Sequence, residues 1–268
     1  MSPSSRQILR ALPLVGAFLR NARAYEVKLT DASLTGASLV GVYSGGIIGT
    51  PASLPTDWLL VNGYLVGSGA DLNGADLNGV DLTDVNLTHA VLRNADLDNS
   101  NLTGANLTET GLIDADLNHA SLADVNLTGA KLKGSNLFDV RSGEISGTAA
   151  SLPQNWMLVD GYLVGPGAWL YDASLSEANL DDADLVNAEL GTATLSGAEL
   201  TGADLQDGDL AGTNLTGADL SGANLSGVVW SDTTCPDGTN SDNDGETCVN
   251  NLGWLSKGGQ FPASEPTG

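Results

Sequence analysis

Three aspartates recur at every fourth repeat of a five-residue pattern, and they are the first side chains in this sequence whose spacing could do chemistry. They are Asp76, Asp96 and Asp116. Carboxylates stacked one layer apart repel by about 1 kcal/mol per neighbouring pair even in water, although exposed side chains can splay apart and salt screens them. The set is therefore either a tolerated feature of a solvated surface or a site that holds cations or contacts a basic partner.

A second set of polar side chains recurs at the same interval. Each member is an Asn-Leu-Thr segment, whose Asn and Thr point to the same side of an extended chain. In register these side chains would form a flat, hydrogen-bonding surface. That surface is either a stabilising asparagine ladder or one that recognises an ordered lattice such as ice or a polysaccharide. The residues are Asn86, Thr88, Asn106, Thr108, Asn126 and Thr128.

The C-terminal segment contains one candidate metal site. Side chains that carry oxygen alternate along it on both sides of Gly245, much as they do in calcium-binding loops. Asn251 stands where such loops place a bidentate glutamate, so an ordinary turn-rich loop without calcium is the alternative. The candidate ligands are Asn240, Asp242, Asp244 and Glu246.

The chain has two cysteines, Cys235 and Cys248, and both lie in this same segment. An even pair in an otherwise Cys-free chain predicts one disulfide. The closed loop is short, so the expected stabilisation is about 3 kcal/mol. We expect the cross-linked segment to cover the exposed strand edge at the end of the fold.

Catalytic groups are scarce. The two histidines, His89 and His119, stand at turn positions separated by six repeats of the five-residue pattern. If four repeats make one layer, this separation puts them on opposite faces. The sequence has no glycine-rich phosphate loop and no metal-binding spacing of His and Cys. We therefore expect a protein that is not an enzyme and that needs no cofactor, calcium aside.

A leucine at every fifth position supplies the element that must position these groups. Leucine occupies 29, 34 and 39, then 72 to 137 and 170 to 225 in steps of five, and Trp230 takes the next position. In the segment 75–79, Ala75 and Leu77 point to one side of an extended chain and Gly79 stands at a turn. Each pentapeptide is a short strand and a corner, which can bury its apolar side only by stacking. Because the polar sets recur at every fourth pentapeptide, each layer has four sides and the polar sets form columns.

This A(D/N)LxG pattern resembles the pentapeptide-repeat family. The resemblance covers residues 27–41, 70–139 and 168–231, and 30 repeats make it specific. It implies an all-β fold, a right-handed quadrilateral β-helix. It also implies one function, because some members protect type II topoisomerases from quinolones by imitating DNA. Those members tend to carry Phe at the central position of the repeat, where this chain has Leu.

Two nearly identical segments interrupt the repeat. The segments 44–67 and 142–165 are identical at 17 of 24 positions. Each contains Asn-Gly or Asp-Gly between two apolar runs, which predicts a β-hairpin. A hairpin with two apolar faces must pack on the solenoid or join its wall, pair with its copy, or bind a partner.

In the first hairpin we expect Val61 to face Tyr64 and Leu60 to face Leu65. If the hairpins bind a partner, their large aromatic side chains are the candidates for the contact. These are Trp58, Tyr64, Trp156 and Tyr162.

The first part of the chain, residues 1–24, differs from the repeat. Arg6 and Arg10 precede an apolar run, and Ala22-Arg23-Ala24 has the small-x-small form of a cleavage site, which is typical of a secretory signal peptide. Arg20 and Arg23 follow the apolar run, and this favours the alternative, a short helix that caps the first coil. We expect an extracytoplasmic or secreted bacterial protein, and otherwise a cytoplasmic one.

These features divide the chain into seven parts. They are 1–24, signal peptide or N-terminal capping helix; 25–41, short pentapeptide block; 42–69, hairpin-containing insertion; 70–139, main pentapeptide block; 140–167, second hairpin-containing insertion; 168–231, acidic pentapeptide block; and 232–268, Cys-closed C-terminal cap and tail.

The net charge of −23 limits the classes of molecule that the protein can bind. No Lys or Arg occurs between Arg141 and Lys257, against 18 acidic residues, and such a surface repels nucleic acid and anionic membranes. No apolar stretch is long enough to span a membrane. We expect a structural or interaction protein that presents a rigid acidic surface to a protein or to an extracellular surface, with self-association at the solenoid ends as a further possibility.

Overall fold

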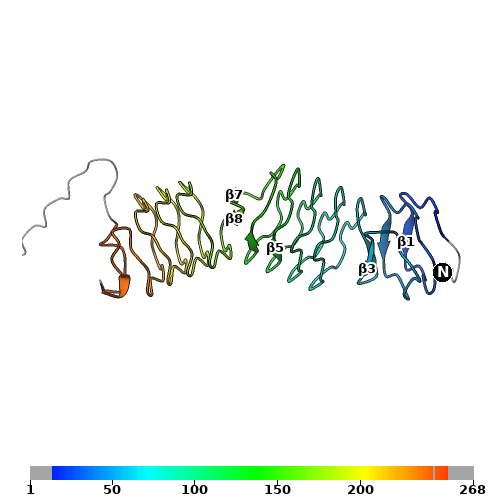
Figure 1. Cartoon of the computed structure of the whole chain (residues 1–268), viewed down its shortest axis with the longest axis horizontal. Coiled ribbons are helices and arrows are strands. Elements are labelled where there is room, and N and C mark those ends of the chain that lie inside the picture. The colour runs from blue at the N-terminus through cyan, green and yellow to red at the C-terminus, as the bar shows by residue number, and fades with distance from the viewer. Residues whose placement is uncertain (1–13, 244, 253–268) are drawn as a thin grey trace, which may run out of the picture. The chain divides into compact units, whose positions relative to one another are not determined.

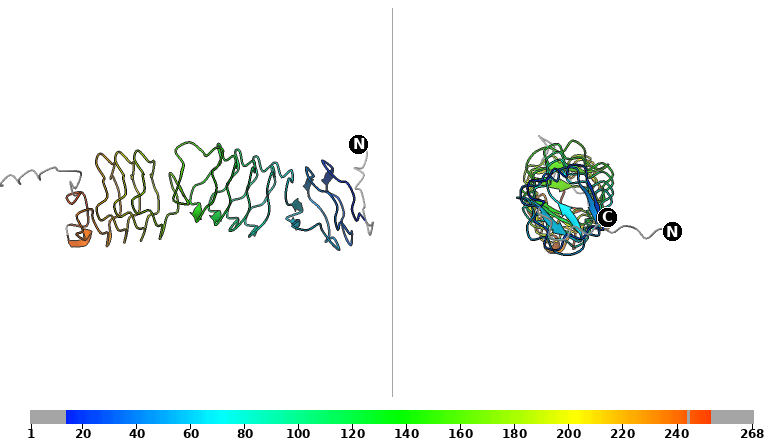
Figure 2. Two further views of the ribbon diagram at one scale, coloured as in Figure 1. Left: turned by 45° about the horizontal axis from the view of Figure 1, so that its top comes forward. Right: turned by 90° about the vertical axis from the view of Figure 1, so that its right-hand side faces the viewer.

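The computed structural model describes residues 14–243 and 245–252. The chain divides into two compact units, Met1–Gln154 (unit 1) and Asn155–Gly268 (unit 2). Each unit is a stack of coils, which Figures 1 and 2 show from three directions. The named strands are all three residues long, and the described residues contain no α-helix. The expected all-β solenoid is confirmed.

The core of each unit follows from the two inward-facing positions of the pentapeptide. Ala75 and Leu77 are 1% and 0% exposed. Asp76, between them, points outward and bridges in parallel to Asp96. The Leu77 N–H donates to the Asp96 carbonyl at 2.8 Å, and the Asp96 N–H donates to the Ala75 carbonyl at 2.9 Å. One coil therefore consists of four pentapeptides, and the leucines of successive coils form a continuous column.

The corners require a left-handed backbone. The Val80 N–H donates to the Leu77 carbonyl across the turn, and Gly79 has φ +64°. The same conformation occurs at 25 described residues other than glycine, such as Asp84 at +56° and His119 at +54°. Asp, Asn and His tolerate it better than most side chains. Many acidic side chains of the protein therefore project from corners.

Unit 1 contains two parallel strand pairs and one hairpin. Its strands are β1 (Arg23–Tyr25), β2 (Tyr43–Gly45), β3 (Leu59–Val61), β4 (Tyr64–Val66), β5 (Ser121–Ala123) and β6 (Arg141–Gly143). β1 pairs with β2 and β5 with β6, each in parallel and each across successive coils. β3 pairs with β4 in the antiparallel direction.

The hairpin of unit 1 has the register expected from its Asn-Gly turn. Leu60 pairs with Leu65 and Val61 with Tyr64. Leu65 and Val66 are 1% and 0% exposed, so the hairpin joins the wall of the solenoid and its second strand faces the core. This agrees with the packing alternative for these apolar residues.

The hairpin lengthens one coil without disturbing the stack. Tyr43 bridges in parallel to Asp71, a wider interval than the four pentapeptides that separate bridged residues elsewhere. The residues before the hairpin continue the ordinary coil, because Lys28 bridges to Ile48 and Ser33 to Ser53. The interruption in the leucine pattern is therefore part coil and part hairpin.

Residues 14–24 depart from the expected capping helix. They contain no helix, and they form a coil in which Phe18 bridges to Ser38 and the Leu14 N–H donates to the Ser33 carbonyl. The reason is visible in the sequence, because Leu14, Leu19 and Ala24 extend the five-residue spacing back from Leu29. Residues 1–13 lie outside the described residues.

Unit 2 begins with the second hairpin and ends in a cross-linked cap. β7 (Met157–Val159) and β8 (Tyr162–Val164) are antiparallel, and a 3-10 turn, η1, spans Ser241–Asn243. Leu163 and Val164 are 0% exposed. Nowhere in residues 14–243 and 245–252 is there a helix long and apolar enough to cross a membrane.

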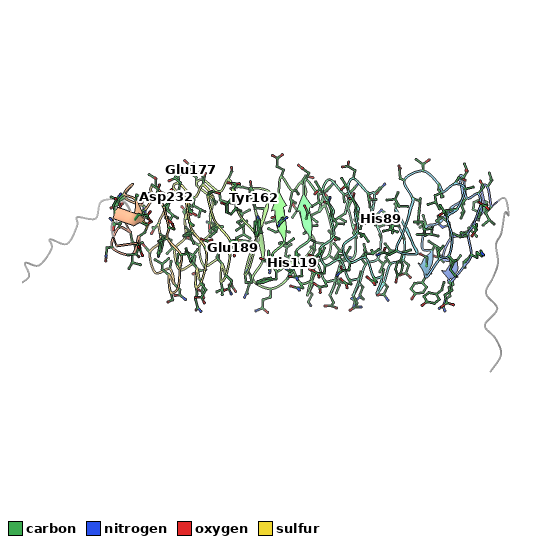
Figure 3. All side chains as sticks on the ribbon, turned by 90° about the horizontal axis from the view of Figure 1, so that it is seen from below. His89, His119, Tyr162, Glu177, Glu189 and Asp232 are labelled. Atoms are coloured by element: carbon green, nitrogen blue, oxygen red, sulfur yellow. A yellow bond between two sulfur atoms is a disulfide. The ribbon has the colours of Figure 1, made fainter. Side chains whose placement is uncertain are left out.

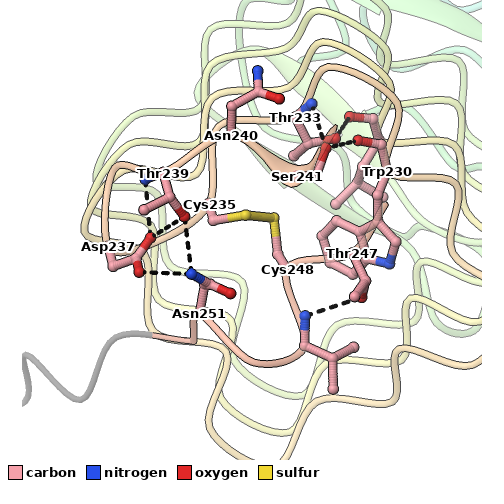
Figure 4. Close-up of a disulfide and its surroundings, with 12 residues drawn as sticks. Trp230, Thr233, Cys235, Asp237, Thr239, Asn240, Ser241, Thr247, Cys248 and Asn251 are labelled. Atoms are coloured by element: carbon pink, nitrogen blue, oxygen red, sulfur yellow. Dashed lines mark hydrogen bonds between the residues drawn. A yellow bond between two sulfur atoms is a disulfide. The ribbon is translucent and has the colours of Figure 1, made fainter. Parts of the chain in front are cut away.

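The predicted disulfide is present. Cys235 and Cys248 are joined, with their Cα atoms 5.3 Å apart, and both are fully buried (Figure 4). Thr233 lies in the same cap, and its hydroxyl donates to the Leu210 carbonyl at 2.7 Å. The cap thus places buried, hydrogen-bonded polar groups, Thr233 and Ser241, against the last coil of unit 2, where Leu225 is partly buried.

Candidate binding surfaces

The aspartate column exists and is hydrogen-bonded. Asp76 bridges to Asp96, and Asp96 bridges to Asp116. Each carboxylate accepts the backbone N–H two residues ahead; for Asp96 this donor is the Asp98 N–H at 3.0 Å. The Asn136 side chain closes the column and donates to Asp116 at 3.0 Å. These local donors hold the carboxylates in place, which explains how three stacked charges are tolerated.

The histidines lie at corners, as expected, and each contacts carboxylates (Figure 3). His89 Nδ1 is 3.1 Å from Glu109 Oε2. His119 lies between two coils, with Nδ1 3.2 Å from Asp98 and Nε2 3.3 Å from Asp139. The sequence analysis missed these contacts because it compared the two histidines with each other and not with the carboxylates one coil away. Glu109 and Asp139 lie in the same columns as His89 and His119, and Asp98 is offset by one residue.

The Asn and Thr side chains are in register, but they bond within each repeat. Asn86 bridges to Asn106, and Asn106 bridges to Asn126. The Thr108 N–H and hydroxyl both donate to Asn106 Oδ1, at 3.0 and 2.6 Å. Thr128 makes the same two bonds to Asn126. The result is a series of preformed turns that leave hydroxyl oxygens on the surface.

The neighbouring face carries a longer chain of hydrogen bonds that the sequence analysis did not single out. The Thr83 hydroxyl donates to Asp81 at 2.5 Å, and Asn101 donates to Thr83 at 2.9 Å. Thr103 donates to Asn101 and is 2.9 Å from the Ser121 hydroxyl. The Thr83 hydroxyl and N–H lower the pKa of Asp81. The recurring Asp/Asn-Leu-Ser/Thr segment is the signal that could have revealed it.

The aromatic side chains of the hairpins are tied into the fold. The Trp58 ring covers Gly67, and the Trp156 ring covers Gly165, where any side chain would collide with the indole. All four candidate residues, Trp58, Tyr64, Trp156 and Tyr162, are only partly exposed.

The two hairpin tyrosines have equivalent bonds. The Tyr64 hydroxyl accepts the Asp76 N–H at 3.3 Å, and the Tyr162 hydroxyl, labelled in Figure 3, accepts the Ser174 N–H at 3.2 Å. Each hairpin therefore caps a backbone donor of the coil that follows it. The structure gives these residues a clear packing role, and a partner contact would have to use their remaining exposed edges.

The acidic block forms rows of stacked carboxylates in unit 2. Asp184 bridges to Asp204, Glu189 to Asp209 and Glu199 to Asp219. The Ser221 hydroxyl and N–H lower the pKa of Asp219. No Lys or Arg lies within 155–243 and 245–252, and Glu177 and Asp232, labelled in Figure 3, are exposed.

The candidate calcium ligands that the structure describes form hydrogen bonds within the cap. Asn240 donates to Asp232 at 2.8 Å and accepts the Asp242 N–H at 2.9 Å, while Asp242 accepts the Asp232 N–H at 2.9 Å. Asp244 lies outside the described residues. Across 14–243 and 245–252, no group of three His, Cys, Asp or Glu side chains is arranged to hold a metal. The described ligands serve to fix the cap, and the geometry lends calcium binding no support.

Comparison with known proteins identifies the repeat. A family model described as "Pentapeptide repeats" matches eight copies, within residues 14–41, 68–104, 100–139, 167–197 and 193–229. Among solved structures, the chain matches HetL, a pentapeptide repeat protein involved in heterocyst differentiation regulation from the cyanobacterium Nostoc sp. strain PCC 7120. The two sequences are 30% identical. The match covers 88% of this chain and 92% of HetL, with a TM-score of 0.27.

Two further solved structures match the chain at lower identity. A pentapeptide repeat protein from the thylakoid lumen of Arabidopsis thaliana is 22% identical over 55% of this chain and 66% of its own, with a TM-score of 0.20. Full-length QnrB1, a plasmid-mediated fluoroquinolone resistance protein, is 14% identical over 92% of this chain and 95% of its own, with a TM-score of 0.23. Among curated proteins, none matches the chain.

Proposed function

Since the chain belongs to the pentapeptide repeat family, we propose that it is a non-catalytic binding protein that presents the acidic surface of its solenoid to a basic protein partner. The observation that supports this most directly is the set of carboxylate rows in unit 2. They stand in a described region, 155–243 and 245–252, that contains no Lys or Arg.

The rows are suited to binding because their geometry is fixed before a partner arrives. Asp204, Asp209 and Asp219 each accept the backbone N–H two residues ahead, at 3.1, 2.9 and 3.0 Å. Side chains that are already ordered lose little conformational entropy on association. A row of like charges also attracts an oppositely charged partner over a distance of about a Debye length and speeds the encounter.

We further propose the finer form of the fold, a right-handed solenoid with four sides. The regular interval of the parallel bridges supports four pentapeptides per coil in both units.

We propose an extracytoplasmic location as well. The disulfide supports it, because such bonds persist in oxidising compartments. Cleavage after Ala24 would divide β1 and remove the coil that donates to the Ser33, Thr35 and Ser38 carbonyls. Sequencing the N-terminus of the native protein tests this. A start at Tyr25 establishes processing at that site, and a start at or before Leu14 shows that the coil is retained.

The partner experiment compares two triple variants that remove charge and keep the turns. Asn can accept the same backbone N–H as Asp, so D204N/D209N/D219N neutralises a surface of unit 2, and D76N/D96N/D116N is the matched control in unit 1. Each protein is immobilised and exposed to an extract of its native source, and bound proteins are eluted with rising salt. We expect a salt-sensitive partner whose affinity falls at least tenfold for the unit 2 variant alone.

Capture of the same proteins by both variants and by the unchanged chain would contradict the proposal, as would turnover of a substrate abolished by changing one surface residue. Two alternatives are tested alongside. Inhibition or protection of a type II topoisomerase in a supercoiling assay at micromolar protein would favour the DNA-mimic function. Thermal hysteresis that is lost in Thr108→Tyr would favour lattice binding through the Asn and Thr face.

A further inference from the structure

Tyr25 of β1 and Tyr64 of β4 meet over a glycine of β2 in unit 1, and Tyr43 lies on the same strand as that glycine. The point of contact is Gly45. A Cβ atom there would lie 3.1 Å from the Tyr25 ring and 3.2 Å from the Tyr64 ring. Tyr43 stands two residues before Gly45 on the same side of β2, since Ser44 between them points inward and is 2% exposed. The glycine therefore makes room for the rings of Tyr25 and Tyr64, and Tyr43 extends the same outer side of β2. We call these three side chains the aromatic platform.

The platform is open and most of its hydrogen-bonding groups are unused. Tyr25 is 59% and Tyr43 37% exposed. Within the part of the chain that the structure describes, neither hydroxyl forms a hydrogen bond. Tyr64 differs, because its hydroxyl accepts the Asp76 N–H and so fixes the ring in place. Exposed, ordered rings with free hydroxyls are a binding surface that the fold itself does not require.

Polar side chains of opposite charge flank the middle tyrosine. Arg23 pairs with Tyr43, and Tyr43 bridges to Asp71, so the three form one column across successive coils. Arg23 makes no ion pair with any described residue. The same column opens into a groove lined by Asn21, Arg23, Gly41, Tyr43, Asp71 and Asn73.

We propose that this groove and platform bind a carbohydrate, with one neutral pyranose ring stacked on Tyr43. The apolar C–H face of a sugar suits an aromatic ring, and its hydroxyls suit a rim that offers both donors and acceptors. Arg23 supplies donors, Asp71 supplies acceptors, and the amides of Asn21 and Asn73 supply both. Arg23 and Asp71 lie one coil on either side of Tyr43, each about 5 Å away along the stack, so both can reach hydroxyls of a single ring placed on Tyr43.

The chemistry of the rest of the chain favours a neutral glycan. A net charge of −23 repels polyanions, and one arginine beside one aspartate gives the groove no net charge. A second copy of this chain is a poorer occupant, because its acidic surface would bring further carboxylates against Asp71.

The second interruption provides an internal comparison. Its hairpin is nearly the same in sequence, and Gly143 corresponds to Gly45, but Ala123 and Arg141 stand where the first has Tyr25 and Tyr43. The parallel strand pair forms in both places, and so does the hairpin. Tyr25 and Tyr43 are therefore needed to build neither element, which is what a binding role predicts.

The test uses the full chain and isothermal titration with four soluble probes: cellohexaose, chitohexaose, maltohexaose and an oligogalacturonate hexamer. We expect at least one neutral hexasaccharide to bind and the acidic hexamer not to bind. Tyr43→Ala should weaken that binding at least tenfold, and Tyr43→Phe, which keeps the ring, should stay within threefold of the unchanged protein. The loss of affinity in Tyr25→Ala should lie between those of Tyr43→Phe and Tyr43→Ala.

Phe138→Ala is the matched control, because Phe138 is 45% exposed and lies off the platform; it should bind like the unchanged protein. Thermal unfolding of each variant checks that the coil still forms. Absence of binding to all three neutral probes overturns the proposal, and so does binding that Tyr43→Ala leaves intact. A concentration-dependent dimer that Tyr25→Ala and Tyr43→Ala dissociate, without glycan binding, also overturns it and assigns the surface to a second copy.

Discussion

The two units carry the same leucine core and manage their charges in different ways. In unit 1, some acidic side chains have cationic or histidine partners: Arg93 lies 3.7 Å from Asp114, and His119 lies between Asp98 and Asp139. In unit 2, the described residues form no ion pair with Lys or Arg, because they contain neither. Unit 2 carboxylates such as Asp204, Asp209 and Asp219 accept backbone N–H groups, as Asp96 and Asp116 do in unit 1. Unit 1 compensates part of its charge with its own cations, and the described residues of unit 2 contain no Lys or Arg that could do so.

The largest expected effect is a loss of stability, and it should be equal in the two units because each has a core of the same leucine type. Leu107→Ala in unit 1 and Leu205→Ala in unit 2 each remove a side chain that is 0% exposed. Each should lower the free energy of opening by about 2–5 kcal/mol. Hydrogen exchange followed by mass spectrometry reports the units separately, and we expect each change to affect its own unit. Equal loss of protection in both units would show that they unfold as one.

The next effect distinguishes the units. Cys235→Ser with Cys248→Ser should destabilise unit 2 by about 3 kcal/mol, since the cross-link restricts the unfolded chain, and should leave exchange in unit 1 unchanged. Reduction of the native protein is the independent control and should reproduce the pattern. If protection in unit 2 survives both treatments, the cap is held by its hydrogen bonds alone.

Salt should change the stability of the two units to different extents, by less than the changes above. Stacked carboxylates repel by about 1 kcal/mol per neighbouring pair in water, and salt screens this. Raising the NaCl concentration from about 0.02 to about 1 M should therefore stabilise unit 2 by about 1 kcal/mol and unit 1 by less. Glu199→Gln should reproduce part of this gain in unit 2 at low salt, with Asp96→Asn as the comparison in unit 1. A larger salt response in unit 1 would reverse the contrast between the units.

The smallest effect should again be common to both units. Hydroxyl and N–H donors lower the pKa of Asp219 through Ser221 and of Asp81 through Thr83, from an ordinary value of 3.8. A lowered folded-state pKa means that this stabilisation is present above the ordinary value and is lost as the pH falls through the lower folded value. Ser221→Ala and Thr83→Ala should each raise the pKa of the neighbouring aspartate. Carboxyl chemical shifts measured by NMR titration test this, and an unchanged pKa would assign the shift to other groups.

Much of the fold follows from the sequence because its signals are strictly periodic. Ala75 and Leu77 are apolar and two residues apart, so both must face the core from a short strand. Asn62-Gly63 selects one hairpin register, which the structure shows. The coil at 14–24 was harder to predict, because Leu14 and Leu19 fit both the repeat and the apolar run of a signal peptide. The local periodicity was present, but a competing pattern used the same residues.

The candidate surfaces were less predictable, because their properties depend on contacts between coils. The columns of Asp76 and Asn86 could be placed by counting, whereas the donors that hold them could not. The contact of His119 with Asp98 depends on how far a corner side chain reaches along the stack. The tyrosine platform depends on the first hairpin, which brings Tyr64 over Gly45 although β3 and its turn stand between them in the sequence.

The constant interval of the backbone hydrogen bonds has a consequence for how the protein acquires its structure. A coil needs only the preceding coil as a template, so almost every contact closes a short loop of chain. Folding can then proceed from one coil to the next as the chain emerges from a ribosome or a secretion channel, without waiting for the far end. The cap that follows the last repeat is the part of the chain whose covalent closure must wait for the oxidation of Cys235 and Cys248.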